Sequence, residues 1–400
     1  MVFMCGKGTL TLRYACIQSF FWMGFASIMG FASVFLLDAG FSNAGIGAVI
    51  AGAGMLSALL QPVAASLAEG RWGLKRMVYG VCAGLTGLGA GVAALYVAEG
   101  PLWITGALYG GCILLLQLAL PLVNALGTEA INRGGRLNWG AARGAGSIAY
   151  AVMAWGLGLL TKSAGAVTVP LLIAGGFALL SAALAAYPLP GGEGGTAAGG
   201  DRGTGSPMEF LRRYPRFGVL LIGTTLLYTG HAILNNYTFQ IVQSKGGSSA
   251  EMGTAAALAA FCELPPMFLF AAMVRRVRCD VWMRVAGAFF TLKLFCTWLA
   301  PGVTVFYGVQ VLQMMGWGVI SVASVFYINE LMDKGDAIKG QAYYTMTITL
   351  GTVLGSLAGG WLLDTAGMDA TLLYTSAASL AGTVIVFAAA QRSRDAGKVL

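Results

Sequence analysis

Charged side chains are scarce in this chain, at 10% of its 400 residues. Soluble domains carry about 25%. Hydrophobic residues make up 57% of the sequence, and a water-soluble chain of this length could not bury that much apolar surface. The composition therefore excludes an ordinary soluble protein and predicts one that lies in a lipid bilayer.

Histidine is almost absent, since His231 is the only one. No phosphate loop, metal-ligand spacing or Ser/His/Asp arrangement is visible. The seven cysteines have no paired spacing, so we expect no disulfides. The first residues lack a short apolar core with a small-residue cleavage site, so no signal peptide is expected. We expect neither metal nor cofactor, which makes a membrane-embedded enzyme the weaker hypothesis.

The basic residues follow a strict alternation along the chain. All of the 24 Lys and Arg except Lys162, Lys245 and Lys293 lie at the two ends or in every second connection between apolar runs. Connections rich in Lys and Arg stay in the cytoplasm. Both termini are therefore predicted to be cytoplasmic. The net charge of +8 lies in short loops beside apolar runs, which argues against nucleic-acid binding.

The apolar runs are long enough for twelve transmembrane helices, since each span needs about 20 residues. The predicted spans lie near 14–37, 44–67, 77–97, 101–127, 142–161, 167–187, 217–242, 251–274, 281–300, 303–327, 341–363 and 368–390. The stretch from Pro188 to Gly205 is almost all Gly, Pro and Ala with a few charges, which is typical of a flexible linker. A helix is expected to start near Ser206 and Pro207. The domains are then a six-helix half at 1–187, a cytoplasmic linker at 188–216 and a second six-helix half at 217–400.

The two predicted halves contain similar sequence segments. Residues 158–165 and 360–367, which end the fifth and eleventh spans, share a Gly, a Leu-Leu pair and a closing Ala-Gly. Duplicated six-helix halves are a transporter architecture. Gly351, Gly355 and Gly359 keep a four-residue spacing, which predicts a face where a neighbouring helix packs closely. The fold class is thus an all-α integral membrane protein with two pseudo-symmetric halves.

Two charged side chains lie well inside predicted spans, Glu263 in the eighth and Lys293 in the ninth. A charge at the bilayer centre costs ~2.5–3.5 kcal/mol on insertion scales, so it is retained where it pairs or functions. Pro265 and Pro266 follow Glu263 and predict a helix break there. The alternative is that Glu263 and Lys293 only pair to join two helices.

Polar residues gather on the seventh span around His231 and Asn235, which share a helix face four residues apart. An imidazole can carry a proton near neutral pH, although a histidine here could equally be a hydrogen-bonded core residue. Asn124 on the fourth span, with Gln310 and Gln313 on the tenth, extends this set. Together these residues indicate a hydrated central cavity.

The segment from Asn138 to Tyr150 opens the fifth span. Arg143 and Tyr150 lie two turns apart on one face. A guanidinium and an aromatic ring on one face can hold a hydroxyl-rich or aromatic ligand. The alternative is that Arg143 only anchors the cytoplasmic end of the helix.

Several of these segments resemble the major facilitator superfamily, in its lactose-permease-like branch of proton symporters. Phe20-Phe21-Trp22-Met23 through Gln61-Pro62 and the loop motif with Arg71, Gly73, Lys75 and Arg76 resemble the first two helices and their gating loop. The usual loop aspartate is Gly70 here. Gly140 to Tyr150 resembles the fifth-helix motif, which implies that Arg143 binds sugar hydroxyls and Tyr150 stacks on the ring.

Other positions match the family in part. Glu263 matches the eighth-helix acid, and Lys293 stands where the ninth-helix arginine is expected. Asn124 replaces a fourth-helix carboxylate, and Gln313 and Gly316 replace the tenth-helix histidine and proton-carrying glutamate. The segment around His231 resembles phenylpropionate-type and nucleoside-type permeases of the same clan.

The resulting hypothesis is a secondary transporter of the cell membrane that takes up a small polar solute with protons by alternating access. The solute would be a sugar, glycoside or nucleoside, bound by Asn124, Arg143, Tyr150, His231, Asn235 and Gln313. Glu263, Lys293 and His231 would couple protons. Alternatives are efflux of hydrophobic compounds, uptake of aromatic acids, or a sensor that does not transport. We expect a monomer whose partners are the solute, protons and the bilayer.

Overall fold

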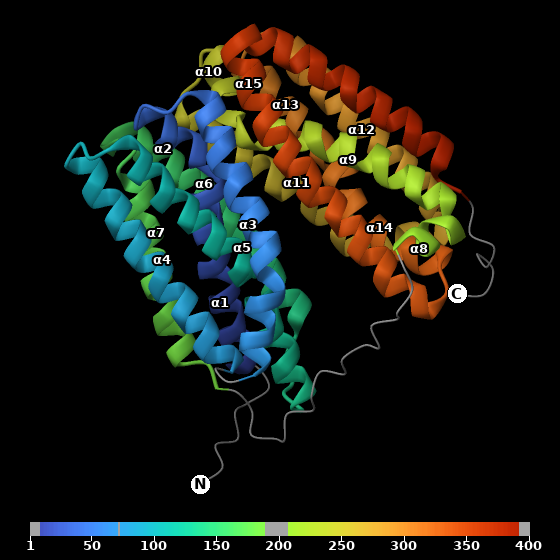
Figure 1. Cartoon of the computed structure of the whole chain (residues 1–400), viewed down its shortest axis with the longest axis horizontal. Helices are drawn as coiled ribbons and strands as arrows, with labels where there is room; N and C mark the ends of the chain where they lie inside the picture. Colours follow the sequence, from blue (N-terminus) through green and yellow to red (C-terminus); the bar gives the residue numbers. More distant parts are fainter. Residues whose placement is uncertain (1–8, 71–72, 189–206, 392–400) are drawn as a thin grey trace. The chain divides into compact units, whose positions relative to one another are not determined.

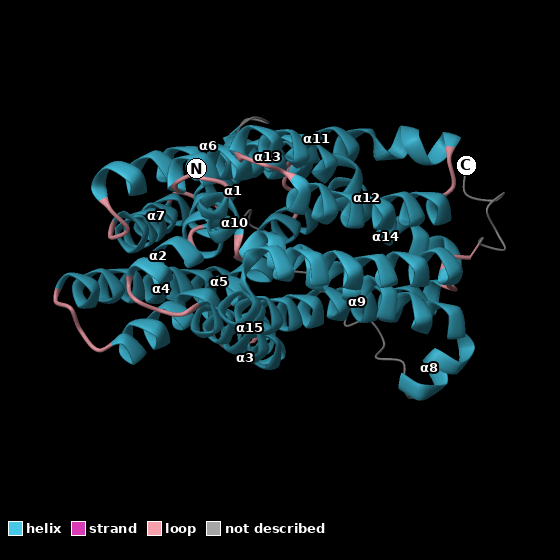
Figure 2. Ribbon diagram, turned by 90° about the horizontal axis from the view of Figure 1, so that it is seen from above, coloured by secondary structure: helices cyan, strands magenta, loops and turns pink. Residues whose placement is uncertain are grey.

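The computed structural model describes residues 9–70, 73–188 and 207–391. Every regular element within these ranges is helical, as Figure 2 shows. The all-α prediction is therefore confirmed for the described residues. The predicted linker falls mostly on 189–206, which lie outside them, but α8 (Pro207–Arg213) begins at the expected proline.

Contacts divide the chain into two compact units. The first holds residues 1–200 with Met252–Ala257, and the second holds Asp201–Glu251 with Leu258–Leu400. The domain limits 1–187, 188–216 and 217–400 stay a prediction.

The described part of the first unit contains seven whole α-helices and a π-helical segment, blue to green in Figure 1. They are α1 (Thr9–Phe25), the π segment Ala26–Gly30, α2 (Ala32–Asp38), α3 (Asn43–Glu69), α4 (Leu74–Val97), α5 (Leu102–Asn132), α6 (Trp139–Ala164) and α7 (Thr168–Ala185). Here α1 packs mainly against α6 and α7.

The second unit contains α8, already given, and the helices that follow it, except for Met252–Ala257 of α11. They are α9 (Pro215–Asn236), α10 (Thr238–Ser244), α11 (Ser249–Arg276), α12 (Cys279–Leu299), α13 (Val303–Gln310), a 3₁₀ turn at Val311–Gln313, a π segment at Met314–Gly318, α14 (Val319–Leu331) and α15 (Lys334–Ala389). Here α9 packs mainly against α15.

Nine helices of the described part are long and apolar enough to cross a membrane, or ten if the bent pair at Leu10–Gly30 and Ala32–Asp38 is one span. α15 enters this count once, although its backbone is not helical at Gly367 (φ 79°, ψ 179°). α12 is not among them; it carries Asp280, Arg284 and Lys293. The chain is thus a multi-pass membrane protein, while twelve spans and cytoplasmic termini stay predictions.

Close packing of α15 on α9 depends on the glycine face predicted from the sequence. A Cβ on Gly351 would lie 2.5 Å from Tyr228 Cβ, and one on Gly355 would lie 2.6 Å from the Thr229 carbonyl oxygen. Both distances are far below van der Waals contact. The prediction that these glycines let two backbones approach is therefore confirmed.

The helix break predicted at Pro265 and Pro266 is wrong, because α11 continues through both prolines. Proline removes a backbone donor, but its fixed φ is compatible with a helix. Inside membranes, packing against neighbouring helices compensates for the backbone groups that proline leaves without a partner. Such packing is present here. A Cβ built on Gly318 would lie 2.7 Å from Pro266 Cγ and 3.3 Å from Glu263 Cα, so a bare glycine backbone supports the proline turn.

Candidate functional site

In the first unit, Arg143 is held between a hydroxyl group and an aromatic ring. Asn138 caps α6 by accepting a hydrogen bond from the Ala141 amide at 3.0 Å, which places Arg143 just inside the helix. Its Nη1 donates to Ser147 Oγ at 2.9 Å. Its Cζ lies over the Trp22 ring, 4.0 Å from the centroid. This geometry is a cation–π contact.

Behind that contact lies a network centred on Gln18, whose side chain is fully buried. Gln18 Oε1 accepts from Trp22 Nε1 at 3.0 Å. Gln18 Nε2 donates to Tyr14 Oη at 2.8 Å and to Asn124 Oδ1 at 3.2 Å. Asn124, predicted to bind solute, is thus tied to α1 through Gln18.

Tyr150 lies farther along α6, beside the π segment of the first span. Its ring centroid is 6.4 Å from that of Phe25, and Phe25 is 5.0 Å from Trp22. Arg143 and Tyr150 therefore both contact α1, one at Trp22 and the other at Phe25. Each is partly exposed, as a ligand-binding side chain must be.

Gly146 permits this approach of α6 to α1. A Cβ at position 146 would lie 2.6 Å from Trp22 Cδ1 and 3.3 Å from the Gln18 carbonyl oxygen. A side chain there would displace the Trp22 ring from beneath Arg143. The glycine-rich start of the fifth span therefore serves the site as well as helix packing.

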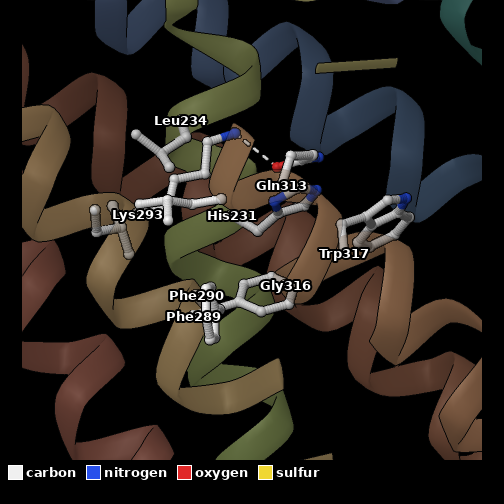
Figure 3. Close-up of a pocket in the computed structure, with 10 residues that line it drawn as sticks. His231, Leu234, Phe289, Phe290, Lys293, Gln313, Gly316 and Trp317 are labelled. Atoms are coloured by element: carbon white, nitrogen blue, oxygen red, sulfur yellow. Dashed lines mark hydrogen bonds between the residues drawn. The ribbon is translucent and has the colours of Figure 1, made fainter. Parts of the chain in front are cut away.

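In the second unit, Gln313 lies between the two charged residues. Lys293 Nζ donates to Gln313 Oε1 at 2.6 Å, and Gln313 Nε2 donates to Glu263 Oε1 at 2.8 Å. Figure 3 shows the Lys293–Gln313 bond beside the His231 and Trp317 rings. The amide thus satisfies a cation with its oxygen and a carboxylate with its N–H group.

His231 is enclosed by aromatic rings and one amide. Its ring stacks on Trp317, with centroids 4.5 Å apart and planes 9° apart. Phe290 meets it edge-on at 5.2 Å. Asn235 Nδ2 lies 2.8 Å from His231 Nε2. A hydrogen bond therefore joins the pair that the sequence placed on one face.

A cavity of about 10 Å³ opens among His231, Lys293, Gln313, Gly316 and Trp317. That is roughly the space one water molecule needs. The structure therefore brings together all the predicted residues of this half: His231, Asn235, Glu263, Lys293 and Gln313.

The loop-motif residues lie elsewhere. Gly73 precedes α4 with φ 74°, a left-handed conformation that suits glycine. Lys75 Nζ donates to the Tyr187 carbonyl oxygen at 2.7 Å, next to the Ala186 carbonyl that accepts from Arg13 at 3.0 Å. Arg76 is exposed, and Arg71 lies outside the described residues. Lys75 and Arg13 thus each bind one carbonyl just beyond the end of α7.

The sequence alone predicted no role for Gln18, Trp22 or Trp317. One signal for the first pair was present, because Gln18 and Trp22 are four residues apart in an apolar run and so share a face. Trp317 could not be singled out among nine tryptophans, since its stacking partner lies on another helix.

Polar clusters on several membrane-spanning helices are typical of membrane transporters. The model of the MFS_1 like family matches residues 11–374. The chain belongs to this family and is a major facilitator superfamily transporter, as the sequence resemblance predicted. It is therefore a secondary transporter rather than an enzyme.

Two relatives at the sequence level are also transporters. A maltose permease of Geobacillus stearothermophilus is 24% identical over 384 residues, covering 94% of this chain and 93% of the relative. A putative sugar efflux transporter of Deinococcus radiodurans is 25% identical over 159 residues, 40% of each chain.

Solved structures share the fold at low identity. A crystal structure of a mutant nucleoside transporter NupG has a TM-score of 0.79 at 13% identity, covering 96% of this chain and all of that one. A bacterial homologue of the iron transporter ferroportin, in an inward-facing state, has a TM-score of 0.76 at 14% identity, covering 96% and 99%.

Proposed function

We propose that this protein takes up a small polar solute, a sugar, glycoside or nucleoside, together with protons across the cytoplasmic membrane. Twelve spans with both ends in the cytoplasm would alternate between inward- and outward-open states. The Lys293–Gln313–Glu263 chain carries this proposal, because it connects a buried cation to a carboxylate beside a small cavity.

The first unit supports the proposed class of solute. Arg143 offers N–H donors beside the aromatic face of Trp22, and the Tyr150 ring lies farther along the same helix, beside Phe25. Donors beside aromatic faces suit sugar rings and nucleosides, which carry hydroxyl groups around a ring. The maltose permease and nucleoside transporter names of the proteins described above support the same class.

The proton would be carried by Glu263. While the carboxylate is ionised it accepts the Gln313 N–H bond, and Gln313 in turn holds Lys293. Protonation removes the negative charge, weakens that bond and changes what Lys293 must contact. A state change follows if the two conformations differ in how well they satisfy Lys293. His231 is the alternative carrier.

Transport in proteoliposomes tests the proposal. We expect a pH gradient that is acid outside, so that protons flow inward, to drive accumulation of labelled maltose, a glycoside or uridine inside the vesicles. A competing function is efflux of hydrophobic compounds or uptake of aromatic acids. Transport of a cationic dye or of phenylpropionate, with no response to any sugar or nucleoside, would replace the proposed solute class.

A further inference from the structure

A continuous set of contacts in the first unit runs from a buried glutamine to the Arg143 guanidinium. Gln18 accepts from Trp22 Nε1, and the Trp22 ring supports Arg143 Cζ at 4.0 Å. The other end of the Gln18 amide donates to Tyr14 and Asn124. Gln18 is therefore bonded at both ends and buried, while Arg143 is partly exposed.

We propose that Gln18 and Trp22 are positioning residues that fix the plane of the Arg143 guanidinium for solute binding. This inference rests on the proposed function of Arg143 as a solute ligand. Gln18 would act on Arg143 through Trp22, and neither Gln18 nor its partner Tyr14 would touch the solute.

The physical argument concerns the direction of the N–H donors. A guanidinium is planar, and its N–H groups point outward within that plane. Contact of one face with the indole fixes the plane, and the Ser147 bond fixes its rotation. The remaining edge donors then point in a set direction, as bidentate recognition of paired oxygens requires.

The indole itself needs an anchor, because a partly exposed Trp side chain can change rotamer. Its Nε1–H bond to Gln18 supplies one, and Gln18 is held on the far side by the Asn124 amide and the Tyr14 hydroxyl. Tyr14 in turn donates to the Val123 carbonyl oxygen of α5 at 3.1 Å. The orientation of Arg143 on α6 is thus coupled to α1 and α5.

Uptake kinetics in proteoliposomes, with labelled maltose and labelled uridine as probes, supply the first test. Trp22→Leu removes the ring face and the N–H donor, whereas Trp22→Phe keeps a ring. We expect KM to rise about 2- to 30-fold in Trp22→Leu and less in Trp22→Phe, with the maximal rate nearly unchanged. Gln18→Leu should raise KM in the same way.

A matched control and a double variant separate positioning from loss of structure. Thr161 on α6 is also buried, and its hydroxyl bonds only carbonyls within its own helical turn among the contacts of the described residues. Thr161→Val should therefore leave KM unchanged. Adding Gln18→Leu to Arg143→Lys should cost no more than Arg143→Lys alone, because both changes interrupt one pathway. Full additivity would contradict the inference.

Chemical modification gives a readout that needs no solute. Phenylglyoxal reacts with guanidinium groups, and mass spectrometry of peptides reports each arginine separately. We expect Trp22→Leu and Gln18→Leu to raise the rate at Arg143 relative to the exposed Arg136. Unchanged Arg143 reactivity and KM in folded Trp22→Leu would overturn the inference, even if Gln18→Leu does not fold. If the wild type transports neither probe, the proposed solute class fails, while Arg143 reactivity still decides the positioning role.

Discussion

Lys293 Nζ donates to Gln313 Oε1 at 2.6 Å, and the other end of the same amide donates to Glu263. An amide is one of the few side chains that can do both, since it carries an acceptor and a donor. The buried Lys293 and the partly buried Glu263 are therefore linked by a group that is itself neutral. By its resemblance to the lactose-permease-like branch, Gln313 occupies the position of a histidine on the tenth helix.

Gln313→Leu should remove both bonds, so that the buried Lys293 loses its acceptor and Glu263 loses one donor. An unsatisfied buried polar group costs about 1–3 kcal/mol, so the thermal midpoint of the purified protein should fall and uptake should be lost. Gln310→Leu is the comparison, because both glutamines are 4% exposed. Equal effects of the two substitutions would contradict a special role for Gln313.

Glu263→Gln mimics the protonated acid and should abolish accumulation against a gradient. Solute exchange at equal concentrations should continue, because exchange does not require net proton movement. Counterflow and pH-driven uptake in the same proteoliposomes measure the two activities. Glu99→Gln changes an exposed carboxylate and should alter neither activity. If Glu263→Gln still accumulates solute fully, Glu263 is not the proton carrier and His231 takes its place in the proposal.

Arg143→Lys should weaken solute binding at least tenfold, because a point charge cannot replace a planar fork of donors. Tyr150→Ala should weaken it too, whereas Tyr150→Phe, which keeps the ring, should do so less. Equilibrium binding of maltose and uridine measures each effect. Unchanged affinity in both Arg143→Lys and Tyr150→Ala would place the site elsewhere.

The topology is testable with single cysteines in a cysteine-free background. Gly199→Cys and Arg394→Cys, at positions outside the described residues, should resist an impermeant thiol reagent in intact cells. Lys162→Cys lies in the opposite set of connections and should react. The motivation is the alternation of basic residues along the chain. Ready labelling at position 199 or 394 would reverse the orientation.

The sequence predicts the helical membrane class well, because hydropathy and charge depend on local composition. It also identifies Glu263 and Lys293, since a charge inside an apolar run is conspicuous. It does not show how they are joined, because Gln313 lies on a third helix. The predicted helix break at Pro265 and Pro266 failed for the same reason. Whether the helix continues there depends on packing against Gly318, which lies on another element.

The first-unit site shows the same limit. Arg143 and Tyr150 follow from spacing on one helix, whereas the Trp22 contact requires α1 and α6 to meet at Gly146. The sequence contains Gly146, but its partner helix is visible only in three dimensions.

Each candidate cluster adjoins a π-helical segment, Ala26–Gly30 in the first unit and Met314–Gly318 in the second. Such segments often mark functional sites and are single-turn insertions within an α-helix. A straight α-helix turns about 100° per residue. Deleting one residue from 314–318 would let the turn become α-helical. The flanking residues, Gln313 and α14 among them, would keep nearly the same directions, but the residues within the turn, including Trp317 that stacks on His231, would not. The site therefore depends on the number of residues in that turn as well as on their identities, and a length change there should be harder to tolerate than most substitutions.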